Sequence, residues 1–193
     1  MQAVSIETSR SLRILYIVRT AFQVVWAAAV IATAMKQPVI AAVLFVLYPL
    51  WDVACTVYDL NTASRSGSAR TSQTINALLG VAAAIGIGLT VFRQPIYSVA
   101  IFGGWAFGAG LLQLVVGLIR RKQAEGGQWA MILSGAQSML AGIAFFLGGL
   151  YDKRHIQDVG GYAIFGAIYF LIGGILLTRQ LSKAAGAVVE TSR

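Results

Sequence analysis

The stretch TAMKQPVI at residues 33–40 is nearly repeated as TVFRQPIY at residues 90–97. Both fit the pattern T-x-x-[KR]-Q-P-[VI], and they are offset by 57 residues. Each joins two apolar runs, and a proline is well suited to the first position of the second run if that run is a helix. A turn that recurs at a fixed interval predicts that the helical hairpin around it recurs as well.

Apolar segments of membrane-spanning length lie on both sides of these turns. Of the 193 residues, 58% are hydrophobic and 11% are charged, and the mean hydropathy is +0.74, outside the usual range for soluble domains. A bilayer core of about 30 Å needs about 20 apolar residues per helix. Six segments qualify: 14–34, 39–58, 74–92, 96–119, 129–150 and 160–178. The sequence therefore predicts an all-α integral membrane protein with one transmembrane domain over residues 1–193.

A second repeat links the fourth and sixth spans. FGAGLLQLVVGLIRR at 107–121 and FGAIYFLIGGILLTR at 165–179 share FGA followed twelve residues later by arginine, with an offset of 58. We therefore expect three tandem two-helix hairpins, at about 12–60, 74–121 and 129–180, arranged as a pseudo-threefold bundle. Small residues that let helices approach closely are expected at Gly104 and Gly108, and at positions 134–142 and 166–174.

The distribution of basic residues predicts the orientation, because Lys and Arg concentrate in cytoplasmic loops. One side collects ten of the fifteen: Arg10, Arg13, Arg65, Arg70, Arg120, Arg121, Lys122, Arg179, Lys183 and Arg193. The other side has Lys36, Arg93, Lys153 and Arg154, while Arg19 lies inside the first span. Both termini are thus predicted to be cytoplasmic, and the net charge of +8 reflects membrane orientation rather than nucleic-acid binding.

The first span has an alternative interpretation as a signal peptide, because basic residues precede an apolar run that ends in ATAM. Arg19 interrupts that run, and the repeat requires the segment as a helix. The membrane-spanning interpretation is therefore favoured.

Two aspartates stand in LYPLWDVACTVYDL, residues 47–60, at the end of the second span. At 1.5 Å per residue, Arg19 lies roughly 8 Å inside the first span and Asp52 roughly 9 Å from the same side in the second. An unpaired charge near mid-bilayer costs about 2.5–3.5 kcal/mol on insertion scales. We therefore predict an ion pair between Arg19 and Asp52. The alternative is that Asp52 is a protonatable site on a proton or ion path.

Asp59 lies two helical turns beyond Asp52 and is expected at the cytoplasmic interface as a solvated helix end. Arg10, Arg13 or Arg65 could pair with it there, with little effect on stability. The single histidine, His155, is assigned to an outer loop beside Asp152 and Asp158, where it would change charge as the medium acidifies.

Enzymatic chemistry is not expected from the reactive side chains. One cysteine and one histidine exclude a multi-cysteine or poly-histidine metal site, and no nucleophile with a base or cofactor motif is present. We predict no metal and no cofactor.

The six spans resemble those of the HdeD-like family of small bacterial membrane proteins. The resemblance rests on YPLWD, TSQTINAL, QWAMILSGAQSMLAGIAFF and GGYAIFGAIYFLIGG, and extends over nearly the whole chain. It implies a multi-pass protein of the bacterial inner membrane and, through the member that names the family, a link to acid resistance. No residue here matches a known active site of that family.

Together these features predict a non-enzymatic inner-membrane protein with a structural or stress-related role. Its expected partners are the lipid bilayer, and itself or other membrane proteins, with no nucleic acid. The alternative is a small transporter or channel with a proton or ion path near Asp52, whose substrate the sequence does not identify.

Overall fold

A computed structural model of the chain describes residues 2–62, 68–122 and 128–191. These residues form six helices and no strand: α1 (Gln2–Thr33), α2 (Pro38–Thr62), α3 (Ser68–Thr90), α4 (Pro95–Lys122), α5 (Gln128–Leu150) and α6 (Asp158–Thr191). Each is long and apolar enough to cross a membrane. The all-helical fold and the six predicted spans are confirmed, although several helices extend well beyond the apolar segments.

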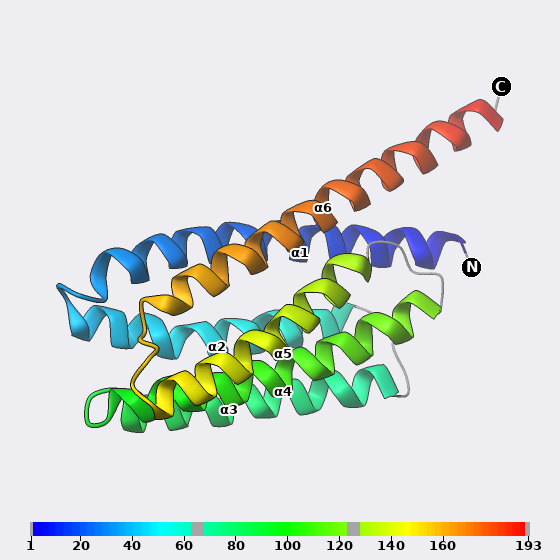
Figure 1. The fold of residues 1–193 in the computed structure, drawn as a ribbon. Coiled ribbons are helices and arrows are strands. Elements are labelled where there is room, and N and C mark those ends of the chain that lie inside the picture. The colour runs from blue at the N-terminus through cyan, green and yellow to red at the C-terminus, as the bar shows by residue number, and fades with distance from the viewer. Residues whose placement is uncertain (1, 63–67, 123–127, 192–193) are drawn as a thin grey trace.

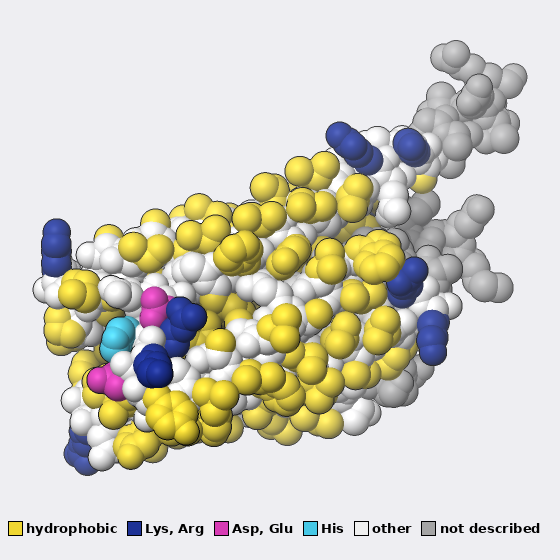
Figure 2. All heavy atoms as spheres, viewed as in Figure 1, with side chains coloured by type: hydrophobic (Ala, Val, Ile, Leu, Met, Phe, Trp, Pro, Cys, Tyr) yellow, Lys and Arg dark blue, Asp and Glu magenta, His cyan; other side chains and the backbone are white. Residues whose placement is uncertain are grey.

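The outer surface of the bundle matches this composition. On the face drawn in Figure 2, hydrophobic side chains cover the length of the bundle, whereas Lys and Arg gather at its two ends. Large apolar side chains such as Val25, Leu78, Leu89 and Leu140 are more than half exposed. An apolar belt between two charged ends is the pattern expected of a protein that sits in a bilayer.

The six helices close into a ring. Each packs against its neighbours in the chain, and α1 also packs against α6 (Figure 1). The C-terminal part of α6 leaves the bundle, and the two termini lie at the same end of the molecule (Figure 1).

The two repeated turns have the same hydrogen bonds. In the first, the backbone N–H of Lys36 and of Gln37 donate to the carbonyl of Thr33, at 3.1 and 2.8 Å. In the second, Arg93 and Gln94 donate to Thr90 in the same way, at 3.0 and 2.7 Å. Each turn is followed by a proline that starts the next helix, at a position where a backbone N–H would have no helical partner.

The closest pair of helices is α4 and α5, and glycines spaced seven residues apart make that approach possible. The facing positions are Gly103, Gly110 and Gly117 on α4, and Gly135, Gly142 and Gly149 on α5. A methyl group on Gly103 would lie 2.2 Å from the backbone nitrogen of Phe146, and one on Gly142 would lie 2.4 Å from that of Phe107. Small residues at such a spacing bring two backbones into direct contact.

The predicted small-residue pair of α4, Gly104 and Gly108, is therefore not the face that meets the α5 backbone. A methyl group on Gly104 would have only the Phe146 ring nearby, at 3.9 Å, and one on Gly108 would meet the Leu79 side chain of α3. Seven residues make about two helical turns, so the seven-residue series stays on one face, and the four-residue pair points toward other neighbours.

The even-numbered helices turn matching side chains into the bundle at intervals of 57 residues. Phe45, Phe102 and Val159 are fully buried, and Tyr48, Trp105 and Tyr162 lie one turn further along. Asp52, Ala109 and Gly166 follow after another turn and line one cavity. Between α4 and α6, the inward positions are thus offset by 57 residues and not by the expected 58. The FGA motif suggested 58, but it aligns Phe107 with Phe165, and both of these side chains face outward.

Candidate functional site

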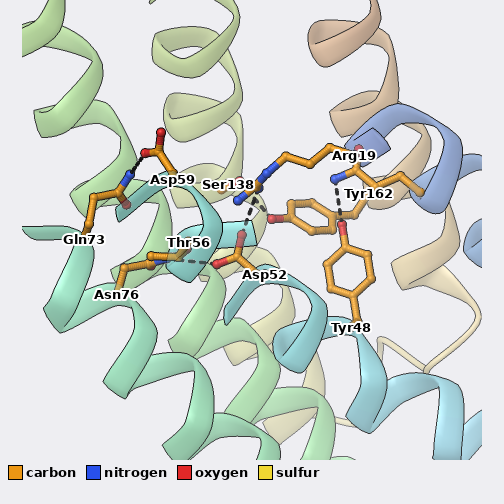
Figure 3. A network of polar contacts seen from close by, with 10 residues as sticks. Arg19, Tyr48, Asp52, Thr56, Asp59, Gln73, Asn76, Ser138 and Tyr162 are labelled. Carbon is orange, nitrogen blue, oxygen red and sulfur yellow. Dashed lines mark hydrogen bonds and ion pairs between the residues drawn. The ribbon is translucent and has the colours of Figure 1, made fainter. Parts of the chain in front are cut away.

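A polar cluster lies inside the bundle where α1, α2 and α3 meet (Figure 3). The Arg19 Nη1 atom of α1 lies 2.9 Å from Asp52 Oδ1 of α2, so the predicted ion pair is present. The other carboxylate oxygen of Asp52 accepts a hydrogen bond from the Asn76 side chain of α3, also at 2.9 Å. Both oxygens of this carboxylate are therefore held by donors from the two flanking helices.

The Arg19 guanidinium has a second contact on its other side. It lies over the Phe170 ring of α6, 5.1 Å from the ring centroid. An aromatic face attracts a cation, and such contacts contribute more when they are shielded from water. Arg19 thus links α1 to both α2 and α6.

The prediction that Asp59 is a solvated helix end is wrong. Asp59 is buried rather than solvated, and its Oδ2 atom is paired with Arg120 Nη2 of α4. The same oxygen accepts a hydrogen bond of 2.5 Å from the Gln73 side chain of α3. The predicted partners were Arg10, Arg13 or Arg65, of which Arg65 lies outside the described residues.

The error has a structural reason. α2 continues to Thr62 and α4 continues to Lys122, so Asp59 and Arg120 both lie within helices rather than at their ends. The Arg120 side chain has no exposed surface at all and also reaches Met131 of α5, with its Nη1 atom 3.8 Å from the sulfur. A residue assigned to a cytoplasmic loop is in fact a buried cation.

Two amides of α3 complete the cluster. Asn76 donates to Thr56 at 3.1 Å as well as to Asp52, and Gln73 holds Asp59. Gln73 directly precedes the apolar part of the third predicted span, so hydropathy alone did not indicate that it lies inside the bundle. The helical spacing of Gln73 and Asn76, three residues apart, was the available signal.

Two small internal cavities flank the Arg19–Asp52 pair. The first, the axial cavity, has a volume of about 30 Å³ and is lined by Arg19, Asp52, Tyr48, Trp105, Tyr162 and Gln113, among others. The second, the inner cavity, has about 20 Å³ and also contacts Asp59, Gln73 and Asn76. Arg19, Asp52 and Gln113 line both, so the ion pair stands between the two spaces.

Aromatic side chains separate the axial cavity from the end of the bundle that carries the repeated turns. The Tyr48 ring lies 6.1 Å from both the Trp105 and the Tyr162 ring, centroid to centroid. Phe102 packs against all three at 5.3–6.0 Å. The Tyr162 hydroxyl is hydrogen-bonded to the Ser138 hydroxyl at 2.8 Å.

A larger outer pocket of about 450 Å³ opens at that end of the bundle. Its walls are mainly apolar and include Ala42, Val99 and Phe92, while the loop after α5 contributes Arg154 and His155. A pocket of this size falls in the range of small-molecule sites.

His155 lies on the rim of the outer pocket and is exposed. Its Nδ1 atom is 3.8 Å from Asp152 Oδ1, and its backbone N–H donates to Asp158 Oδ2 at 2.9 Å. Asp152 itself adopts a left-handed conformation, with φ at 54°. The two predicted acidic neighbours are therefore next to His155, and it lies far from the Arg19–Asp52 pair along the bundle.

Metal-binding side chains do not cluster in the part of the chain that the structure describes. No group of three or more His, Cys, Asp and Glu side chains lies close enough there to hold a metal ion. Cys55 is buried, next to the apolar residues Leu15 and Trp51.

When the chain is compared with protein-family models, with curated proteins and with solved structures, none of them matches. The site is therefore interpreted from its own geometry.

Proposed function

We propose that the protein is a non-enzymatic, multi-pass component of the bacterial inner membrane with a structural or stress-related role. The observation that carries this proposal is the neutralised polar interior. Asp52 is held by Arg19 and Asn76, and Asp59 by Arg120 and Gln73. These charges tie four helices together, which favours a rigid bundle that acts through contacts with itself or with other membrane proteins.

The proposal includes three tandem hairpins around a pseudo-threefold axis, with both termini in the cytoplasm. It is supported by the two turns with the same hydrogen bonds, by the inward positions spaced 57 residues apart, and by the excess of basic residues at one side. The test replaces Cys55 with serine and introduces Lys36→Cys or Lys122→Cys. A membrane-impermeant maleimide applied to spheroplasts should label position 36 and not position 122, and the opposite pattern would overturn the orientation.

A stress-related role is proposed from the resemblance to the HdeD-like family. His155 would be the pH-responsive group, because it is exposed and lies between two carboxylates at the outer end. A strain that lacks the gene should survive acid exposure less well than one carrying it. Complementation with His155→Asn should restore survival only in part if His155 senses pH, and fully if it does not.

A second candidate is a small transporter or channel. It is favoured by the outer pocket, the axial cavity and the inner cavity, which contact successive turns of α2 from Ala42 through Asp52 to Asp59. The aromatic side chains around Tyr48 would then act as the closed part of the path.

One flux measurement separates the two candidates. Proteoliposomes that carry a pH-sensitive dye inside are given a proton gradient, and dye response is compared with that of empty liposomes. A structural role predicts no protein-dependent flux. A flux that disappears with Asp52→Asn, while the variant still reconstitutes as a folded protein, would support transport and overturn the structural proposal.

A further inference from the structure

We propose that the axial cavity is a binding site for water, filled by about two molecules that bridge polar side chains from α1, α2, α4 and α5. Its volume of about 30 Å³ exceeds the ~10–15 Å³ that one water requires. This inference concerns the resting structure and holds whether or not anything crosses the membrane.

Five of the residues that line the cavity carry buried polar atoms without a protein partner. Among the described residues, Trp51 Nε1, Trp105 Nε1 and Gln113 Nε2 are buried donors without an acceptor, and Gln23 Oε1 and Gln137 Oε1 are buried acceptors without a donor. All five residues line the axial cavity. Trp105 and Gln23 are more than nine-tenths buried, so bulk solvent cannot satisfy them.

These atoms match the chemistry of water. A buried donor or acceptor without a partner is costly, which is why nearly all of them are satisfied in folded proteins. A buried water typically makes about three hydrogen bonds and both donates and accepts. Three donors and two acceptors around one small space fit that requirement, whereas an apolar occupant would leave all five unsatisfied.

The repeat explains why the space exists. Asp52, Ala109 and Gly166 occupy equivalent inward positions on α2, α4 and α6, 57 residues apart. Two of the three are very small. The neighbouring layer is filled by three aromatic rings, whereas this layer is filled by the Asp52 side chain alone. The shortfall in side-chain volume lies next to the carboxylate of Asp52, where water is also the natural ligand of a charged group.

The first test is spectroscopic and uses the tryptophans of the native chain. In detergent micelles, the indole N–H signals of Trp51 and Trp105 should show magnetisation transfer from water. The control is Trp26, whose indole N–H donates to the carbonyl of Leu44 at 2.7 Å. Absence of transfer at Trp105 under conditions where the exposed Trp129 shows it would overturn the proposal.

The second test compares two substitutions of equal shape at the cavity wall. Threonine and valine add the same volume at Ala109, so any steric strain is common to Ala109→Thr and Ala109→Val. A hydrated cavity should make the threonine variant the one with the higher Tm, whereas a dry cavity favours valine. Equal Tm values or a higher Tm for valine would contradict a hydrated site.

A control and a fallback complete that comparison. Val30 is fully buried in the apolar core, and Val30→Thr should lower the Tm because the surrounding side chains are mainly apolar. If neither larger side chain is tolerated at position 109, Ala109→Ser and Ala109→Cys give the same comparison at smaller volume, with serine expected to be the more stable.

A different observation supports a second site, on the surface at the other end of the bundle. We infer that Trp129, Arg179 and Lys183 bind the headgroup of an anionic phospholipid. These residues line a pocket of about 300 Å³ between α5 and α6, with Leu176 on its membrane side. The Arg121 guanidinium lies over the Trp129 ring, 4.1 Å from its centroid, which adds a third cation.

Charge complementarity identifies the ligand. Within the described residues, neither Arg179 nor Lys183 forms an ion pair, and both are exposed where their helix leaves the apolar belt. Basic residues at this level are attracted to anionic headgroups. Tryptophan at the same level is typical of a membrane interface.

The test measures thermal stabilisation by lipid. Phosphatidylglycerol added to the detergent-solubilised protein should raise the Tm by several degrees, and phosphatidylcholine should not. Arg179→Gln with Lys183→Gln should abolish this difference. The matched control, Lys36→Gln with Arg93→Gln at the opposite end, changes the net charge equally and should retain it. Equal loss in both double variants, or equal stabilisation by inorganic phosphate, would overturn a headgroup site.

Discussion

At the scale of single residues, the contacts of Asp52 make the Arg19–Asp52 pair testable by substitution. Asp52→Asn leaves Arg19 without its anion in a partly shielded site, so we expect a loss of about 2–3 kcal/mol in the free energy of unfolding, below the ~3–5 kcal/mol typical of a fully buried pair. Adding Arg19→Gln should recover part of that loss. Unfolding in SDS titrations measures all three variants, and strictly additive losses would contradict the pairing.

The Arg120–Asp59 pair should be more sensitive, because the Arg120 side chain has no exposed surface. Arg120→Gln is expected to cost about 3–5 kcal/mol, since it removes the buried cation that is paired with the buried carboxylate of Asp59. The adjacent Arg121→Gln is the control and should cost less than about 1 kcal/mol, because Arg121 is exposed. A similar loss in both variants in the same SDS titration would show that the buried pair contributes no more to the free energy of unfolding than the exposed arginine.

The sequence predicted one of these pairs and missed the other for a physical reason. Arg19 and Asp52 interrupt apolar runs, and the cost of an unpaired charge in a bilayer leaves few alternatives to pairing. Arg120 stands beside Arg121 and Lys122, where a cluster of basic residues resembles a solvated end. Its helical spacing from Gln113 and Val116 places it on the inward face of α4 and could have indicated burial. Which face of α4 points inward, however, is known only from how the helices pack.

At the scale of helices, the contact between α4 and α5 depends on glycine at the facing positions. A methyl group on Gly110 would lie 2.7 Å from the carbonyl oxygen of Gly135 and 2.8 Å from the nitrogen of Met139. We expect Gly110→Ala to lower the Tm and to cost about 1–3 kcal/mol, because the facing backbone cannot move aside as a side chain can. The measurement is thermal unfolding in detergent.

The control substitution is Gly161→Ala, since nothing lies within 4 Å of a methyl group there. Alanine is a better helix former than glycine by about 1 kcal/mol, so this variant should be neutral or slightly stabilised. A loss of stability at Gly161 equal to that at Gly110 would mean that helix propensity rather than packing controls the result.

Helix number and the hairpin turns could be predicted from the sequence because hydropathy and the proline signal are local. The rotation of each helix about its axis could not be predicted with the same success. On α4, glycines occur at 103, 104, 108, 110 and 117, and several pairs among them have a plausible helical spacing. The choice between them depends on what α5 presents in return, which is information from a different part of the chain.

At the scale of the whole molecule, the closed ring means that the order of helices along the chain is one of several that could build the same bundle. α1 packs against α6, and both termini lie at the same end (Figure 1). A circular permutant that joins the termini through a flexible linker and opens between α2 and α3 should therefore fold, with helicity unchanged and a Tm within about 2–4 °C of the parent, equivalent to roughly 1 kcal/mol.

Opening the chain between α4 and α5 is the matched comparison. Those helices form the closest contact. Opening the chain between them removes the short connection that keeps them near each other during folding. This permutant should refold from SDS in lower yield than the first, and equal yields would contradict the argument. If the first permutant folds as expected, the closed ring does not depend on where the chain is opened between α2 and α3 or between α6 and α1, and a fusion partner could be attached at either of these two openings.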